Sequence, residues 1–395
     1  MKKQAIPIYL FSFFMVMPGQ ALFPVLPLIR DEMNASYSQI SIFVACLGIV
    51  RIVFAFPGGF LADRFDRRKI LLLGGLLSIM GLLILSVSDN IFQLIVSRAL
   101  IGMGSIICTI TILVLLAQIA SVDSRGVMMS MNNVVHHAGA IVSAALAGIL
   151  AGWYDWRLPF LFIAGLILIS MIMVSVSLTD QRPDRGRERD AGSVNTGFYL
   201  QKNFRTEISN LLPVFALSLF VLFYRGSFRH TLIPFYGKDV FHIDVMALGL
   251  YISLASFFGM VSLLIFGFVS DHYGRKVALI PGISFSMIAV AALYLPKESN
   301  PLLIACALVG AGSTINSMPN VLISDLVPSG SLGRVLGINR VFGDSGYFLG
   351  PIVVGSLLDH FGFRMPLFVV AGFSVFALIL ACFCVHNRPS ETLKQ

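Results

Sequence analysis

The stretch Gly59-Phe-Leu-Ala-Asp63-Arg64-Phe-Asp66-Arg67-Arg68-Lys69 holds the densest charge in the first half of the chain and lies between two long apolar runs. A second copy, Gly267-Phe-Val-Ser-Asp271-His-Tyr-Gly274-Arg275-Lys276, follows 208 positions later with the same apolar flanks. A repeat with so long a period occupies half of the protein. The two copies therefore predict a chain built from two similar halves.

The composition places the chain in a lipid bilayer. Apolar residues make up 57% of the chain and charged residues only 12%, too few to cover a soluble globule of 395 residues. The five cysteines lie in apolar segments without metal-ligand spacing. We therefore expect neither a disulfide framework nor a metal site.

The apolar segments predict an all-α membrane protein. A bilayer core about 30 Å thick takes roughly 20 apolar residues per helix, and cutting the chain at charges and turn residues gives twelve spans. The run from Ala5 to Ile29 is longer than a signal-peptide core, so we interpret it as the first span. We expect a six-helix bundle over residues 1–180, a polar linker over 181–208 and a second six-helix bundle over 209–395.

Basic residues gather on one side of the predicted membrane. Clusters at 64–69, within the linker and at 275–276 share a side with both termini, whereas the opposite side carries isolated basic residues. The positive-inside rule then places both termini and the linker in the cytoplasm. We expect the protein to lie in the plasma membrane. This placement accounts for the net charge of +8 without nucleic acid as a partner.

The duplication extends beyond the charged stretch. Four residues of the first half recur in the second half at a constant offset of 207. They are Gly126, Asn132, Gly139 and Gly148, which match Gly333, Asn339, Gly346 and Gly355. Two parallel repeats of six helices are related by an axis along the membrane normal, and transporters of this kind bind their cargo between the repeats.

The charged stretch resembles the signature Gly-x-Leu-Ala-Asp-Arg-x-Gly-Arg-Lys of the major facilitator superfamily, and the resemblance covers the whole chain. One position departs: Asp66 replaces the second glycine, which the later copy keeps as Gly274. Aspartate tolerates a left-handed backbone better than most residues, so we expect the turn to be preserved. The resemblance, which is strongest to proton-coupled drug and metabolite exporters, implies alternating access.

The resemblance also implies a cytoplasmic gate at this stretch. Asp63 can face the positive amino end of another helix, while Arg67 and Arg68 lie among headgroups or pair across the loop. In the family such contacts form in one state and break in another. The alternative is that the basic loop only anchors the chain. The candidate gate residues are Gly59, Asp63, Arg64, Arg67, Arg68, Asp271, Arg275 and Lys276.

Two charges reach the middle of the membrane, Arg51 in span two and Asp344 in span eleven. An unpaired charge there is costly, and the resemblance implies that these two spans face each other. We therefore expect an Arg51–Asp344 pair between the halves that opens and re-forms, with Asp344 exchanging a proton. The alternative is a local pair between Asp344 and Arg340, one helical turn earlier.

Three further residues are candidates for proton coupling. Arg98 begins a stretch that resembles the Arg-x-x-Gln-Gly-x-Gly signature of span four, a position linked to proton coupling in similar exporters; alternatively it reaches the outer headgroups. His137 holds the position equivalent to Asp344 in the first half, beside His136. Imidazole titrates near neutral pH, although hydrogen-bonded packing is an alternative role for both histidines.

The candidate cargo residues lie on spans that line the cavity in the fold this chain resembles. Arg225 in span seven could hold an anionic group, whereas its neighbours Arg229 and His230 could extend outward. Polar candidates could equally form hydrogen bonds between helices. The other candidates are Gln20, Phe23, Asn316 and Asn320.

These features predict a monomeric secondary transporter without a cofactor, most simply one that exports a drug or amphipathic metabolite in exchange for protons. An alternative is transport of an anionic metabolite or siderophore in either direction, which is argued from Arg51, Arg225 and Arg340 against a single central acid. A membrane sensor or passive pore is a third hypothesis, which the two-fold repeat disfavours. The sequence shows no nucleotide-binding loop, nucleophile triad or metal cluster, so it gives no indication of an enzyme or a primary pump.

Overall fold

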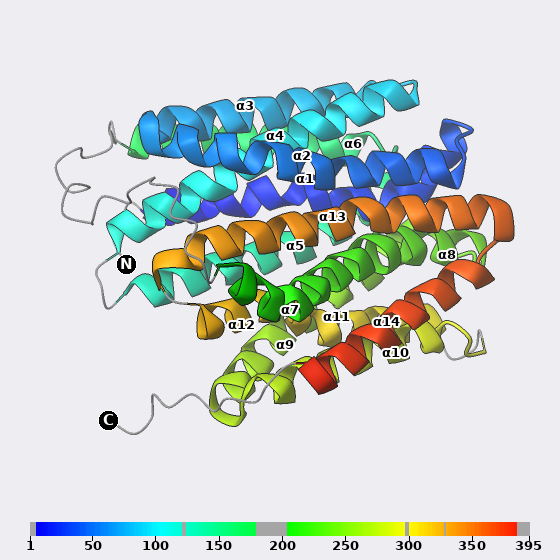
Figure 1. Ribbon diagram of the computed structural model, residues 1–395. Coiled ribbons are helices and arrows are strands. Elements are labelled where there is room, and N and C mark those ends of the chain that lie inside the picture. The colour runs from blue at the N-terminus through cyan, green and yellow to red at the C-terminus, as the bar shows by residue number, and fades with distance from the viewer. Residues whose placement is uncertain (1–4, 121–123, 179–203, 297–299, 328, 385–395) are drawn as a thin grey trace.

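The computed structural model describes residues 5–120, 124–178, 204–296, 300–327 and 329–384. These ranges are helical and contain no strand. Within them, twelve helical segments are long and apolar enough to cross a membrane, which confirms the predicted all-α architecture. Figure 1 shows them as long rods running in roughly the same direction, with most of the earlier helices toward the top of the view and most of the later helices toward the bottom.

The first six spans are single helices. They are α1 (Ala5–Glu32), α2 (Tyr37–Arg64), α3 (Arg67–Ser86), α4 (Ile91–Ile119), α5 (Arg125–Trp153) and α6 (Leu158–Ser177). Short polar loops join them, and polar side chains cap some of the helices. The Asn90 side chain, for example, accepts a hydrogen bond of 3.0 Å from the Gln93 backbone N–H at the start of α4.

The later spans are less regular, since two of them are broken. Span seven comprises α7 (Phe204–Tyr224), the π-helix η2 (Arg225–Leu232) and α8 (Ile233–Asp239), and span ten comprises α11 (Pro301–Ala311), the 3-10 helix η4 (Gly312–Asn316) and α12 (Met318–Leu326). The unbroken spans are α9 (Val245–Tyr273), α10 (Arg275–Ala292), α13 (Ser329–Phe361) and α14 (Arg364–Cys384). Since α7 begins at Phe204, the helix starts inside the predicted linker, most of which lies outside the described residues.

The π-helix η2 is polar and contains a glycine. The Thr231 hydroxyl donates a 2.9 Å hydrogen bond to the Gly226 carbonyl, five residues earlier. The side chain thus satisfies a backbone acceptor within the widened turn. Short π segments inside α-helices often mark functional sites. This one changes the direction in which the side chains of Arg225 and Arg229 project.

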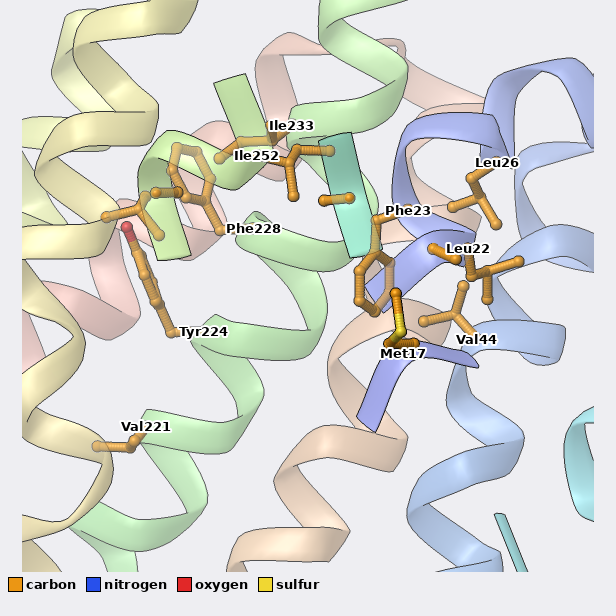
Figure 2. Packing of buried hydrophobic residues seen from close by; sticks show 14 of the residues in the cluster. Met17, Leu22, Phe23, Leu26, Val44, Val221, Tyr224, Phe228, Ile233 and Ile252 are labelled. Atoms are coloured by element: carbon orange, nitrogen blue, oxygen red, sulfur yellow. The ribbon is translucent and has the colours of Figure 1, made fainter. Parts of the chain in front are cut away.

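Apolar side chains form the core on both sides of the interface between the halves. Figure 2 shows Met17 and Phe23 of α1 near Val44 of α2, while Tyr224 and Phe228 point into the second half. The Tyr224 hydroxyl donates a 2.9 Å hydrogen bond to the Ser286 carbonyl of α10. This bond satisfies a polar group that would otherwise be costly in the membrane interior.

The helices of the two halves meet along α2 and α13 and along α5 and α9. Gly148 and Gly249 let α5 approach α9 closely, because a Cβ atom on Gly148 would lie 2.8 Å from the Gly249 Cα. The glycines of span eleven divide between two contacts. Gly355 faces Ser41 of α2, whereas Gly346 and Gly350 face α7 of their own half.

We call the end of the bundle at which α1 begins and α14 ends the terminal end, and the opposite end the distal end (Figure 1). The two halves are tied together at the distal end. Asp239 accepts hydrogen bonds from Arg30 at 2.5 and 3.0 Å and from the Tyr37 hydroxyl at 2.8 Å. Asp359 accepts 2.9 Å hydrogen bonds from the backbone N–H groups of Tyr37 and Ser38.

We refer to Arg30, Tyr37, Asp239 and Asp359 as the distal lock. Asp359 of α13 caps the amino end of α2, where a carboxylate is favoured by the unsatisfied N–H groups and by the helix dipole. Arg30 also lies over the Tyr37 ring, with its guanidinium carbon 4.6 Å from the ring centroid. The contacts to Asp239 and Asp359 cross between the halves and close the distal end, while the contact between Arg30 and the Tyr37 ring lies within the first half.

Candidate functional site

A cavity with two adjoining chambers lies between the halves. The histidine chamber, of about 330 Å³, includes His136 and His137, and the aspartate chamber, of about 530 Å³, includes Asp344. The lining extends to Asn133 near the start of α5 and to Leu336 near the start of α13, so the cavity extends toward the terminal end. With the distal lock closed, this conformation offers the cavity to one side of the bundle.

The chambers share a wall made of Arg225, Asn316 and Asn320. Arg225 is the first residue of the π-helix η2 and Asn316 is the last residue of the 3-10 helix η4, so both broken spans contribute to the wall. The Asn320 side-chain oxygen accepts a 2.9 Å hydrogen bond from Asn339, whose own oxygen accepts one of 2.5 Å from Ser218. These bonds fix the orientation of the wall amide.

The aspartate chamber is organised by a carboxylate between two arginines. Asp344 is 3% exposed. Its Oδ1 lies 3.9 Å from Arg51 Nη1 across the interface, and its Oδ2 lies 3.5 Å from Arg340 Nε on the same helix. The interhalf pair and the local pair, posed as alternatives from the sequence, are thus present together. Oδ2 is buried without a hydrogen-bond partner, so the contact with Arg340 is an ion pair only.

The histidine chamber has a different chemistry. Its wall carries Arg225 and Arg229 but no Asp or Glu among the described residues. Arg229 does not extend outward, because its Nη2 donates a 2.9 Å hydrogen bond to Ser256. The complete lining is Val16, Gln20, Asn133, His136, His137, Ala140, Arg225, Arg229, Ser256, Gly259, Leu263, Ser313, Asn316, Ser317 and Asn320.

Of the predicted cargo residues, Phe23 is misplaced. Gln20, Arg225, Asn316 and Asn320 all border the histidine chamber, but Phe23 is 1% exposed and does not. Its ring stacks on His230 with the centroids 3.8 Å apart. Phe23 is therefore a packing residue at the contact between α1 and η2. The outward position considered for His230 is also wrong, since this side chain is buried.

Arg98 is buried outside both chambers. It is 1% exposed, which rules out the outer headgroup position in this conformation. Its guanidinium carbon lies 5.9 Å from the Phe43 ring centroid, and Tyr347 of the other half lies beside it. The Tyr347 hydroxyl also forms a 2.9 Å hydrogen bond with Nδ1 of His230. Arg98 thus belongs to a buried polar group that spans the interface beside the cavity.

The first charged stretch differs from expectation at two positions. Asp66 does not take a left-handed backbone: its φ is −59°, and its side chain caps α3 by accepting a 3.0 Å hydrogen bond from Arg68 N–H. Gly274 in the second copy does have a positive φ, +94°. Arg67 is only 4% exposed, so it is not among headgroups. The burial of Gly59 and the side chain of Asp63 lie outside what the structure describes, while the side chains of Arg64 and Arg68 are accessible.

The second charged stretch forms a network within its own half. Arg275 contacts Asp271 at 2.5 Å and Asp325 of α12 at 2.7 Å. Lys276 donates a 2.7 Å hydrogen bond to the Cys382 carbonyl of α14. These contacts hold the terminal ends of four helices of the second half together and do not reach the first half.

The distal lock was missed by sequence reasoning. Arg30 is one of the isolated basic residues opposite the termini, and its partner Asp239 lies 209 positions away. One signal was present: Asp31 and Asp239 occupy equivalent positions in the two halves at the 208-residue offset. No group of three or more His, Cys, Asp or Glu within the described ranges could hold a metal ion.

The comparisons with known proteins agree on one family. The family model described as Major Facilitator Superfamily matches residues 8–348 and 261–395. The chain is 22% identical to the quinolone resistance protein NorA of Staphylococcus aureus strain COL, covering 100% of this chain and 99% of that protein. It is also 22% identical to the hexuronate transporter of Bacillus subtilis strain 168, covering 99% and 97%.

Solved structures show the same fold. The nucleoside transporter NupG superposes with a TM-score of 0.81 at 12% identity, covering 97% of this chain and 100% of that one. The inward-open xylose transporter XylE from E. coli superposes with a TM-score of 0.79 at 13% identity, covering 98% and 97%. The chain belongs to the major facilitator superfamily and is a membrane transporter rather than an enzyme.

Proposed function

We propose that this transporter couples cargo movement to protons through Asp344. The observation that carries the proposal is the position of this carboxylate, buried at the cavity wall between Arg51 of the opposite half and Arg340 of its own helix. Buried ionisable groups at membrane depth are costly and commonly serve ion or proton pathways. Asp344 is also reachable from the cavity, since it lines the aspartate chamber.

The charge of Asp344 affects how the halves are held together. When it is ionised, its attraction to Arg51 stabilises the conformation with the closed distal end, because the pair crosses from α13 to α2. Protonation removes that attraction and leaves the cations Arg51 and Arg340 facing each other, which favours separation of the halves at this level. A ligand that binds one protonation state better then shifts the population between conformations.

The direction of transport and the cargo rest on different observations. The likeness to a quinolone resistance protein supports efflux of a drug or amphipathic metabolite. The arginines at both chambers, and the likeness to a transporter of hexuronate, a sugar acid, support an anionic cargo. We place the protein in the plasma membrane as a monomer with the terminal end in the cytoplasm, so that the cavity faces inward in this conformation.

Proteoliposomes test the coupling. A resistance and metabolite screen of a strain lacking the gene first identifies a cargo. Asp344→Asn protein should then insert normally but fail to concentrate or extrude that cargo when a proton gradient is imposed. The matched control is Asp89→Asn, because Asp89 is a surface acid far more exposed than Asp344. Gradient-driven movement by Asp344→Asn protein at the wild-type rate would show that Asp344 is not the coupling group.

A further inference from the structure

The histidine chamber has two arginines and no Asp or Glu among its described lining residues. The Nε atoms of Arg225 and Arg229 are buried and have no hydrogen-bond partner. Although Arg229 donates to Ser256, a hydroxyl does not neutralise its charge. Asp344 lies near Arg225, but two other arginines already contact that carboxylate, so its single charge does not balance the buried guanidinium groups around it. An excess of buried positive charge at membrane depth is costly to maintain. The cost is offset when an anion occupies the chamber.

The remaining wall indicates what kind of anion fits. Amides and hydroxyls surround the arginines, among them Gln20, Asn133 and Ser313. No Phe, Tyr or Trp lines this chamber among the described residues, and its larger aliphatic side chains are Val16 and Leu263. Pockets for drug-like molecules are lined mainly by apolar and aromatic groups. This wall is instead suited to a ligand with many hydrogen-bonding groups.

The chamber is also built from both halves of the chain. Arg225 and Arg229 come from η2, whereas His137 and Asn133 come from α5. A ligand held by the arginines on one side and by the α5 side chains on the other would contact both halves at once. Its binding energy can therefore favour one conformation over another.

We infer that the histidine chamber binds a hydroxylated organic acid, with the carboxylate held by Arg225 and Arg229 and the hydroxyl groups held by the surrounding amides and hydroxyls. Guanidinium groups recognise carboxylates through paired, charge-assisted hydrogen bonds, which a lysine would not reproduce. The inference deepens the proposed function, since it names the class of cargo for the same cavity. It disfavours an amphipathic aromatic drug as the principal cargo.

Binding to purified, detergent-solubilised transporter tests this inference without a gradient. Thermal stability would be followed with increasing D-glucuronate, D-galacturonate or D-gluconate, and with D-glucose and a quinolone as the neutral and aromatic comparisons. The sugar acids should raise the melting temperature of the wild-type protein in a saturable manner. In Arg229→Gln the half-saturating concentration should rise roughly 10-fold to 100-fold, as expected for loss of charge-assisted hydrogen bonds.

Two further variants control the experiment. Arg334→Gln removes the same charge from an exposed position on α13 and should bind the acids as the wild type does. Arg229→Lys keeps the charge without the planar group and should fall between the wild type and Arg229→Gln; it also serves if Arg229→Gln is poorly folded. The inference is overturned if no sugar acid stabilises the wild type more than glucose, if the quinolone alone binds saturably, or if both Arg229 variants bind acids like the wild type.

The two proposals can fail separately. Because binding is measured at equilibrium, Asp344→Asn protein should still bind the acids if the histidine chamber is the acid site. Acid binding together with unimpaired proton-driven transport by Asp344→Asn would contradict the coupling proposal alone. Loss of coupling in Asp344→Asn, with no acid binding to the wild type, would contradict the cargo inference alone.

Discussion

The histidine chamber and the aspartate chamber share Arg225, Asn316 and Asn320 but place charge in opposite ways. The first has arginines and no acid among its described lining residues, so its charge is available to a ligand. The second has a buried carboxylate that two arginines already contact. The difference teaches that arginines in one cavity can serve two purposes, cargo recognition on one side of the wall and conformational control on the other.

The largest effect is expected from the residue common to both chambers. Arg225→Gln removes a cation that faces the proposed ligand and also lies near Asp344. Arg225→Gln should reduce the transport rate more than Arg229→Gln or Arg340→Gln does. The expected reduction is about 10-fold to 100-fold, because each charge-assisted hydrogen bond lost costs roughly 1.5 to 3 kcal/mol. Transport rates of the three variants, measured side by side in proteoliposomes, check this. If Arg225→Gln reduced transport less than Arg229→Gln does, the two chambers would not have the separate roles described above.

The next effect separates the two partners of Asp344. Arg51→Gln breaks the pair that crosses between the halves, whereas Arg340→Gln breaks only a pair within α13. We expect Arg51→Gln to weaken the dependence of transport on the proton gradient and Arg340→Gln to leave most of it. Initial rates with and without an imposed gradient measure the dependence. A harmless Arg51→Gln beside a damaging Arg340→Gln would make the functional pair local.

A smaller effect is expected at the distal lock, which lies away from both chambers. Asp239→Asn removes a carboxylate that accepts from Arg30 and Tyr37, at a cost of about 1 to 3 kcal/mol. Asp359→Asn weakens the cap of α2 by at most about 1 kcal/mol, since asparagine caps helices nearly as well. Both should increase the population with an open distal end, Asp239→Asn more than Asp359→Asn, without altering a residue of the histidine chamber. Distances between spin labels across the distal end report this population.

The fold was predictable because its signals are local and repeated. Apolar runs of span length and two copies of a charged stretch specify twelve helices in two similar sets. Helical spacing was also sufficient to bring Arg51 and Asp344 to one depth and to place Arg340 one turn from Asp344. The prediction for Asp66 failed because an aspartate at a helix start has an alternative to the left-handed turn: it can cap the helix with an ordinary backbone.

The remaining site features depend on information that spacing does not contain. Phe23 has the correct depth, but its direction is decided by packing against His230. Arg229 enters the chamber because η2 is a π-helix, and an α-helical projection does not give the direction of its side chain. The distal lock joins residues about 200 to 320 positions apart, and only the packing of the halves brings them together.

The central claim is that the charge of Asp344 controls the conformation, and a pH-dependent distance between the halves tests it most directly. Spin labels on Gln39→Cys and Phe361→Cys, in a background without the native cysteines, would report on opposite sides of the distal end. His137→Gln is the comparison variant, because His137 is another ionisable side chain that lines the cavity. The account predicts that acidification lengthens this distance in the wild-type and His137→Gln proteins, and that Asp344→Asn shows the longer distance at every pH. A wild-type response to pH in Asp344→Asn would contradict it.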